Sequence, residues 1–484
     1  MIDRRQMLAG LSATAALPFA ARAAEAPTVA DLRQDVAILR DALALHPGLY
    51  RYNTPSQGAA RLARFEAAFV AAPHLEGRYL LLSRFLATIR CGHSYCNFYN
   101  QKKAVAAALF DRGTRLPFHF RWRGGAMIVT DHGGPELPRG SEVLAIQGVA
   151  PRDMLARLLP YARADGHNDA KRVSLLEVRG DDSIEYFDVF HGLEYGAPPG
   201  GVHRIVARRP DGRRVAVACP AIGLAQRRAQ TAARDYRGGA PVWGWTMRPD
   251  GIALLTMPGW ALYDSKWDWR GWLDARLDSL AGAKGLVVDL RANEGGEDCG
   301  DPILARLIRT PIVLPTAERR VRFRRTPAAL DRYLDTWDDS FRTLGVGARP
   351  VGNGYYALQG ERDAAVIHPA SPPLDLPVAA LVGPVNSSAT FQFAENARRS
   401  GRVRLFGART GGNRRGINGG CFFFVRLPGS GIEFDLPLIG YFRRELQPDA
   451  GLVPDTTVTA SIADIAAGRD PVLDRAIRWL HQRD

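Results

Sequence analysis

The pattern of apolar and polar residues divides the chain into three stretches. From about Val29 to Thr88, apolar residues recur every three to four positions, which is typical of amphipathic helices. Over residues ~115–225, apolar and polar residues alternate between Gly, Pro and Asp turns, which predicts strands. From about Gly251, strand-length apolar runs alternate with helical patterns. This alternation favours an α/β unit with a largely parallel sheet.

The length of 484 residues exceeds what one growing core accommodates, so two or three domains are expected. We predict an N-terminal helical domain over residues 26–110, a β-rich domain over 111–245 and an α/β core over 246–484. Residues 1–25 are expected to be a signal peptide. No internal repeat is evident.

The N-terminus reads "MIDRRQMLAGLSATAALPFAARAAEAP", with adjacent Arg4 and Arg5, a short apolar stretch and an Ala-rich cleavage region. This arrangement resembles a bacterial twin-arginine export signal. An ordinary secretory signal that contains two arginines is the alternative. Either one predicts a periplasmic or secreted mature protein. No later stretch reaches 18 uninterrupted apolar residues, so we expect no membrane span after signal removal.

The composition is that of a globular protein, with 46% apolar and 24% charged residues. The net charge of +14 comes mainly from arginines scattered along the chain, and no zinc-finger, RNA-binding or helix-turn-helix signature is present. We therefore do not expect nucleic-acid binding. The five cysteines are too few for a disulfide scaffold.

The first candidate for chemistry is "GLVVDLRANEGGEDCG" (285–300), in which an apolar strand leads to Gly295 and Gly296. Two glycines after a strand allow a ligand to approach the backbone, with N–H groups available to an anion. A simple strand-to-helix turn is the structural alternative. This stretch alone does not decide between the two.

The second candidate is "VNSSATFQFAENARRSG", in which Ser387 and Ser388 stand between a predicted strand and a helix that ends at Gly401. Both serines could simply cap the helix. Alternatively, Ser388 could attack a carbonyl whose oxygen is bound by the N–H groups of Ala389 and of Gly295 or Gly296. The two stretches together fit an acyl-transfer site better than either does alone.

These stretches, together with "RVRLFGARTGG", resemble the tail-specific (C-terminal processing) protease family. The resemblance assigns the nucleophile to Ser388 and implies a crotonase-like (ClpP-like) α/β spiral core. It further implies hydrolysis of peptide bonds in a peptide or protein substrate, without a metal or an organic cofactor. Within the β-rich domain, "LPRGSEVLAIQGVAPRDMLARLL" resembles the latter half of a PDZ module.

The base must differ from that of many family members, which pair the serine with a lysine shortly after "T-x-G". The matching position is Asn413, and no lysine follows Lys284, so a Ser–Lys dyad at the usual place is excluded. Arginine cannot replace it as a base. The stretch "IRCGHSYCNFY" around His93 resembles the tricorn-type branch, in which an N-terminal histidine reaches the serine. We therefore predict that His93 is the base.

A histidine base needs an orienting partner. Ser94 is adjacent to His93, and the segment "GYFRRELQPDAGLVPDTTV", which resembles the family's closing segment, offers Glu445 and Asp449. Any of the three could serve. Exposed loop carboxylates are the structural alternative for the last two.

Other interpretations of the histidine stretch remain. Cys91, His93 and Cys96 could ligate a metal, but neither C-x-H nor C-x4-C is a usual zinc spacing, and no second ligand pair is evident. A small disulfide between Cys91 and Cys96 is also open. A nucleotide-binding enzyme is disfavoured because no G-x-G-x-x-G or Walker A motif follows a strand. A catalytically inactive peptide- or ligand-binding protein on the same fold is the main alternative.

Overall fold

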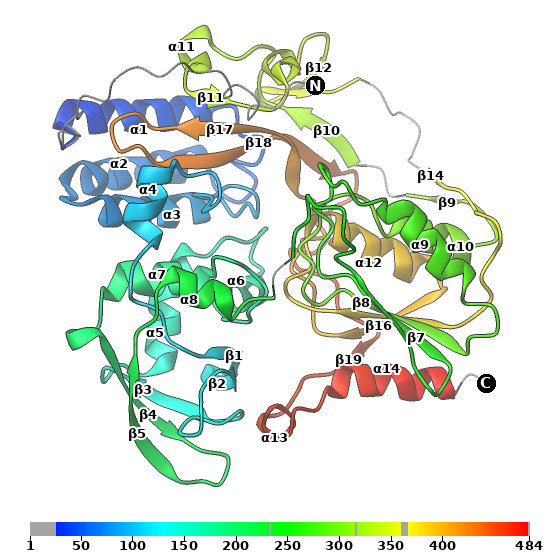
Figure 1. Cartoon of the computed structure of the whole chain (residues 1–484). Helices are drawn as coiled ribbons and strands as arrows, with labels where there is room; N and C mark the ends of the chain where they lie inside the picture. The colour runs from blue at the N-terminus through cyan, green and yellow to red at the C-terminus, as the bar shows by residue number, and fades with distance from the viewer. Residues whose placement is uncertain (1–25, 233, 315–316, 360–365, 483–484) are drawn as a thin grey trace, which may run out of the picture.

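The computed structural model describes residues 26–232, 234–314, 317–359 and 366–482. The predicted signal peptide, residues 1–25, lies outside this part of the chain. Within it, the strands form four sheets, and helices cover them (Figure 1). None of the described helices has the length and apolar character needed to cross a membrane.

The helical texture predicted for the first stretch is confirmed. Threonines at both N-caps begin the first two helices with reciprocal side-chain and backbone hydrogen bonds. The helices are α1 (Val29–Leu43), α2 (Pro55–Ala71), α3 (Leu75–Ala87) and α4 (Lys103–Phe110).

The second stretch forms a five-stranded antiparallel sheet in the order β1-β2-β3-β4-β5. Between β3 and β4 the chain is helical, which the strand-like sequence texture did not predict. The strands are β1 (His119–Arg123), β2 (Ala126–Asp131), β3 (Glu142–Ile146), β4 (Val202–Arg208) and β5 (Arg214–Pro220). The helices between β3 and β4 are α5 (Pro151–Leu158), η1 (Leu159–Tyr161), α6 (Asp169–Leu175), α7 (Tyr186–Tyr195) and η2 (Pro199–Gly201), and α8 (Leu224–Ala229) follows β5. The PDZ-like string corresponds to β3 and α5, and its PDZ character stays a prediction.

The third stretch forms a six-stranded sheet in the order β19-β16-β15-β8-β7-β6, parallel except for β6, as the sequence predicts. Its strands are β6 (Gly244–Met247), β7 (Ile252–Thr256), β8 (Gly285–Asp289), β15 (Val378–Val382), β16 (Val403–Gly407) and β19 (Thr456–Thr457). Its helices are α9 (Trp269–Asp278), α10 (Asp301–Leu307), α12 (Ser388–Ser400), α13 (Ile462–Ala466) and α14 (Pro471–His481).

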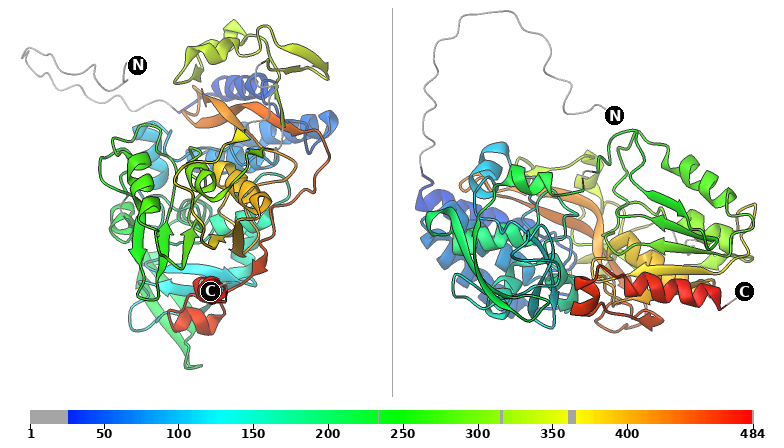
Figure 2. Two further views of the ribbon diagram at one scale, coloured as in Figure 1. Left: turned by 90° about the vertical axis from the view of Figure 1, so that its right-hand side faces the viewer. Right: turned by 60° about the horizontal axis from the view of Figure 1, so that its bottom comes forward.

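Helices cover both faces of this parallel sheet. Residues of α9, α10 and α12 share one apolar core with one face, and α14 packs on the other. Figure 2 shows α14 on the side of the molecule away from α1–α3. The sheet is therefore buried on both sides, as near-continuous apolar strands require.

The insertion between β8 and β15 builds a further sheet with the later hairpin, in the order β11-β17-β18-β10-β13-β12. The apolar faces of β17 and β18 join the same hydrophobic core as α1–α3 and the β1–β5 sheet, so the first two predicted domains share one core. The remaining elements are β9 (Ile312–Val313), β10 (Ala317–Val321), α11 (Ala328–Asp331), β11 (Leu334–Asp335), η3 (Asp339–Thr343), β12 (Arg349–Gly352), β13 (Tyr355–Ala357), β14 (Val366–Ile367), β17 (Asn418–Arg426) and β18 (Glu433–Arg443).

Candidate active site

Ser388 is the first residue of α12, directly after the loop that follows β15, and its side chain is half-buried. Its φ of 50° lies in the left-handed region, which a residue with a Cβ adopts at a cost. Such strain persists only where the surroundings enforce it, and it gathers at functional sites. The predicted end of the helix is confirmed, because Gly401 caps it with a φ of 66°.

Buried amides fix this loop against the loop after β8. The Asn386 side-chain N–H groups donate to the carbonyls of Leu290 at 2.5 Å and Asn293 at 2.9 Å. The Thr390 hydroxyl donates to the side-chain oxygen of Asn293 at 2.7 Å. The strand-end loop and the helix start are therefore positioned as one unit.

Gly295 lies directly against the serine. A Cβ at Gly295 would come within 2.9 Å of the Ser388 Cβ, so a larger residue there would displace the serine. The Gly295 N–H donates to the Asn293 side-chain oxygen at 2.8 Å and is thus committed elsewhere. The backbone N–H groups of Ala389 and Gly296 donate no hydrogen bond to another described residue. Of the predicted oxyanion donors, Ala389 and Gly296 have the available N–H groups.

Ser387, the neighbouring serine, is held in a buried network that sequence analysis missed. The Lys171 ammonium donates to the Ser387 hydroxyl at 2.6 Å and to the Val385 carbonyl at 3.2 Å. The same ammonium pairs with the Glu294 carboxylate at 2.8 Å, and the Ser387 hydroxyl donates to the Glu294 carbonyl at 3.0 Å. Burial lowers the pKa of Lys171, and the Glu294 charge opposes that shift.

A lysine does therefore meet the serine pair, but it contacts Ser387 and comes from α6. Lys171 precedes Ser387 by 216 positions, so it does not stand at the family's usual lysine position after the serine, where a Ser–Lys dyad was excluded. The Ser387 hydroxyl does not cap α12 with a hydrogen bond. The hydroxyl instead joins the loop before α12 to Lys171 and to the Glu294 carbonyl.

His93 lies in the loop after α3, half-buried, with its ring centroid 6.0 Å from that of Phe422. Its Nδ1 is buried and has no hydrogen-bond partner among the described residues. Burial lowers the pKa of His93, and the charge of Asp165 acts in the opposite direction. The imidazole is therefore favoured in its neutral form, which can accept a proton.

Charged groups join the His93 loop to the serine loop. The Arg163 guanidinium donates to the carbonyl of Gly92 and, at 2.9 Å, to the Glu294 carboxylate. The Gly92 N–H donates to the Asp165 carboxylate at 2.8 Å. Glu294 is adjacent to Gly295, so the residue preceding His93 is tied to the residue preceding the glycine pair. The loops that carry the predicted nucleophile and base thus belong to one connected site.

Ser94 has a different partner from the predicted one. Its hydroxyl lies 2.7 Å from Nε2 of buried His46. Because the Gly48 N–H donates to His46 Nδ1 at 2.8 Å, the proton of this imidazole resides on Nε2 and points at Ser94. The Ser94 hydroxyl therefore accepts a hydrogen bond from His46 Nε2, and no described hydrogen bond joins Ser94 to the His93 ring.

The two predicted carboxylates also have other surroundings. Asp449 accepts hydrogen bonds from His167 Nδ1 at 2.6 Å and from Asn413 at 2.7 Å. Glu445 is exposed and lines a surface pocket beside Arg414. Neither has a described hydrogen bond to His93. Instead, Asp165 lies close to the imidazole, within 4.8 Å.

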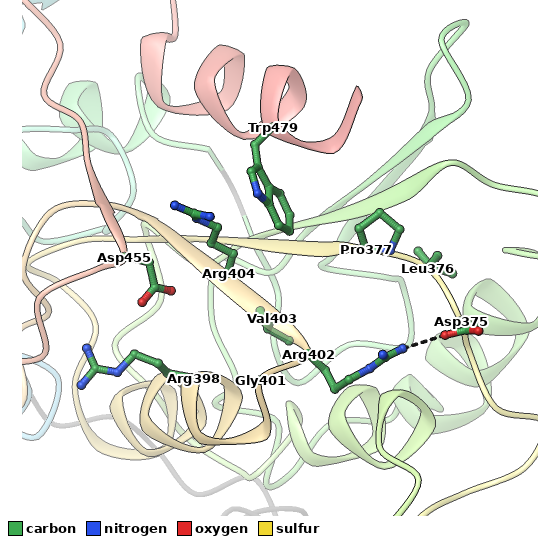
Figure 3. Close-up of a pocket in the computed structure, with 10 residues that line it drawn as sticks. All are labelled: Asp375, Leu376, Pro377, Arg398, Gly401, Arg402, Val403, Arg404, Asp455 and Trp479. Atoms are coloured by element: carbon green, nitrogen blue, oxygen red, sulfur yellow. Dashed lines mark hydrogen bonds and ion pairs between the residues drawn. The ribbon is translucent and has the colours of Figure 1, made fainter. Parts of the chain in front are cut away.

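Two hollows lie near these elements. A cleft of about 750 Å³ between the β1–β5 sheet and the ends of β7, β8 and β15 is lined by Gly383, Pro384 and Val385, just before the serine pair. A second pocket, of about 660 Å³, lies at the other end of α12, where Arg402 binds Asp375 at 2.9 Å (Figure 3). None of the predicted site residues lines the second pocket.

Comparison with known proteins bears on the α/β part of the chain and on the fold. Residues 251–433 match the model of peptidase family S41, which marks the α/β part as a serine-type peptidase. No curated protein matches the chain.

Solved structures resemble nearly the whole chain. The structure of mature CPAF complexed with lactacystin has a TM-score of 0.62 and 18% identity, and covers 94% of this chain and 99% of that chain. The crystal structure of mature CPAF has a TM-score of 0.59 and 17% identity, and covers 94% of this chain and 98% of that chain. The photosystem II D1 C-terminal processing protease has a TM-score of 0.39 and 13% identity, and covers 91% of this chain and 98% of that chain. The CPAF likeness shows a shared mixed α/β fold, and the crotonase-like spiral stays a prediction.

Proposed function

We propose that this serine-type peptidase cleaves peptide bonds in peptide or protein substrates, with Ser388 as nucleophile and His93 as base. The observation that carries the proposal is the Ser388 backbone, held in the left-handed region at a helix start beside the unoccupied Ala389 N–H. Sharp strand-to-helix turns of this kind present nucleophilic hydroxyls in other hydrolases. Export is also proposed, supported by the twin arginines of the leader.

In the proposed reaction, the Ser388 hydroxyl oxygen bonds to the substrate carbonyl carbon while its proton passes to the neutral His93. The oxygen that becomes negative accepts hydrogen bonds from the N–H groups of Ala389 and Gly296. The C–N bond then breaks, and His93 gives the proton to the leaving amine. Water hydrolyses the acyl-enzyme by the same steps in reverse.

We further propose Asp165 as the carboxylate that orients His93, supported by its distance from the imidazole and by its fixed position on the Gly92 N–H. The Arg163–Glu294 pair would hold the two loops in register. Ser94, Glu445 and Asp449 are less well placed for this role, because each has another partner or faces solvent.

The test is labelling of the purified protein with a fluorophosphonate, followed by mass-spectrometric mapping of the modified residue. Wild type and Ser387→Ala should both be modified at Ser388, and Ser388→Ala should not be labelled. His93→Gln should label at least about 100-fold more slowly, which is the usual loss when a general base is removed. A label on Ser387, or undiminished labelling of Ser388→Ala, would reassign the nucleophile. Absence of labelling in the folded wild type would favour the inactive binding protein.

A further inference from the structure

Three potential metal ligands meet beside the proposed base. The Cys91 sulfur, a His93 ring nitrogen and an Asp165 carboxylate oxygen all lie within 4.8 Å of one another. Sequence spacing argues against zinc because Cys91 and His93 have no second ligand pair nearby. The fold brings Asp165, from the segment after η1, to these two residues as a third ligand. The lack of a second ligand pair in the local sequence therefore does not exclude a metal site.

The distances between these three ligand atoms fit a shared metal ion better than hydrogen bonds between the side chains. No described hydrogen bond joins the three side chains to one another, and His93 Nδ1 is buried without a partner. Ligands sharing one tetrahedral zinc, with bonds of about 2.0–2.3 Å, lie about 3.3–3.8 Å apart. Small side-chain movements would bring the three atoms to those distances, with water in the fourth position.

Asp165 is fixed with one oxygen uncommitted. Its Oδ1 accepts the Gly92 N–H at 2.8 Å, and its Oδ2 has no hydrogen-bond donor among the described residues. A Cβ at Gly92 would stand 2.8 Å from Oδ2, so the glycine permits this approach. The carboxylate is therefore oriented on one side and available for coordination on the other.

Burial and the Asp165 charge raise the pKa of the Cys91 thiol, and the hydrogen-bond donors around its sulfur oppose that rise. Its side chain is 1% exposed, and it accepts hydrogen bonds from Ser94, Asn418 and the His93 N–H, the last at 3.4 Å. Outer-shell donors of this kind orient a metal ligand and stabilise its charge. The His46–Ser94 contact described above then forms the next layer of support.

The charges around the three ligands are mixed. Arg163 and Lys171 both act on His93 and share one carboxylate, that of Glu294, at 2.9 and 2.8 Å. The buried Arg51 guanidinium also acts on Cys91 and Asp165, and its hydrogen bond to a carbonyl of β18 at 3.0 Å leaves its charge uncancelled, so a divalent ion is favoured only when Cys91 is a thiolate. A Cys91 thiolate and the Asp165 carboxylate would together match the charge of a divalent ion.

We propose that Cys91, His93 and Asp165 form a zinc site that inhibits the peptidase. Binding of Zn²⁺ would release the Cys91 thiol proton to solvent and occupy a His93 nitrogen lone pair. A zinc-bound imidazole is a poor proton acceptor, so the Ser388 proton would have nowhere to go. The inhibition rests on the proposed function, whereas the binding does not.

Binding is tested by competition of the apo-protein with a chromogenic zinc chelator, and by the thiolate-to-metal charge-transfer absorption of the Co²⁺ form. Wild type should bind one ion with that absorption. Cys91→Ser and Asp165→Asn should bind at least about tenfold more weakly, and Cys91→Ser should lose the absorption. Cys96→Ser, a buried thiol in the same loop, is the matched control and should bind as wild type does.

Inhibition is tested separately by fluorophosphonate labelling with and without equimolar Zn²⁺. Zinc should suppress labelling of wild type and Cys96→Ser, EDTA should restore it, and Cys91→Ser should label equally in both conditions. No binding by wild type, or unchanged binding by folded Cys91→Ser, would overturn the site. Binding by a protein that never labels would instead contradict the proposed function and leave the site intact.

Discussion

At the scale of single residues, the sharpest feature is the left-handed backbone of Ser388. Ordinary residues pay about 1–2 kcal/mol for this conformation, and glycine does not. The site therefore retains a side chain at a position where stability favours none. This is the pattern expected where function, rather than packing, selects the residue.

Replacing Ser388 separates these two demands. Ser388→Gly should be more stable than Ser388→Ala by about 1 kcal/mol, because only glycine relieves the backbone strain. Both variants should fail to label with fluorophosphonate. The difference in the free energy of unfolding is measured by urea denaturation. Equal stability of the two variants would mean that the loop relaxes without cost and that the strain is absent in solution.

Lys171 offers a second residue-scale test. Lys171→Met removes the ammonium that donates to the Ser387 hydroxyl and the Val385 carbonyl and that pairs with Glu294, which leaves the buried Val385 carbonyl without this donor and the Glu294 carboxylate with one cation fewer. We expect a loss of about 2–3 kcal/mol in unfolding free energy and slower labelling of Ser388 at temperatures where the protein remains folded. The exposed Lys266→Met is the control and should change stability by less than about 0.5 kcal/mol. If Lys171→Met changed neither the unfolding free energy nor the labelling rate, the lysine would have no role in positioning the serine loop.

At the scale of elements, the sequence predicts the parallel sheet and α12 well because their apolar runs and bounding glycines are local signals. The helices within residues 151–195 were not predicted, because they are short and the strand patterns on either side of them dominate the region. The meeting of β17 and β18 with α1–α3 had no local signal. That contact depends on packing between segments hundreds of positions apart.

The packing of β18 against the loop after His93 makes stability depend on pH. Asp435 accepts hydrogen bonds from Asn97 and Asn100, both at 2.8 Å. Burial nevertheless raises its pKa to about 7, from an ordinary value of 3.8, with Arg163 lowering and Glu433 raising it. The folded state thus holds this proton more tightly than the unfolded state does. The stabilisation is complete below pH 3.8 and is lost as the pH rises through 7.

Between pH 5 and pH 8 we therefore expect the unfolding free energy to fall by on the order of 2–4 kcal/mol through this group. Asp435→Asn, which cannot ionise, should flatten that slope whatever its effect on absolute stability. Denaturation curves at several pH values measure it. An identical slope in wild type and Asp435→Asn would assign the dependence to other groups.

At the scale of the whole molecule, the candidate site is assembled from both ends of the chain. The sequence offered Ser388 and His93 as candidates because each stands in a recognisable stretch, and their roles stay a prediction. It could not identify Arg163, Asp165 or Lys171, since an isolated charged residue in a polar stretch carries no sign that the fold will bury it. Only their long-range partners distinguish them from surface charges.

Arg163 connects these parts and can be tested directly. Its guanidinium contacts Gly92, Glu294 and the Tyr186 hydroxyl, a set that the single ammonium of lysine cannot reproduce. Arg163→Lys should slow Ser388 labelling on the order of tenfold to 100-fold by loosening the two loops. Arg157→Lys is the control, because the exposed Arg157 side chain pairs with Glu194 away from the two loops. Labelling that falls only in proportion to a lower melting temperature would indicate a general loss of folding instead.

The Lys171–Ser387 contact also bears on when the protein can act. Lys171 comes from α6 and Ser387 lies directly before α12, so the loop that leads into the predicted nucleophile gains this hydrogen bond only when parts of the chain 216 positions apart have packed together. We therefore expect the order of this loop, and with it any labelling of Ser388, to appear late in refolding, together with the packing of the two parts.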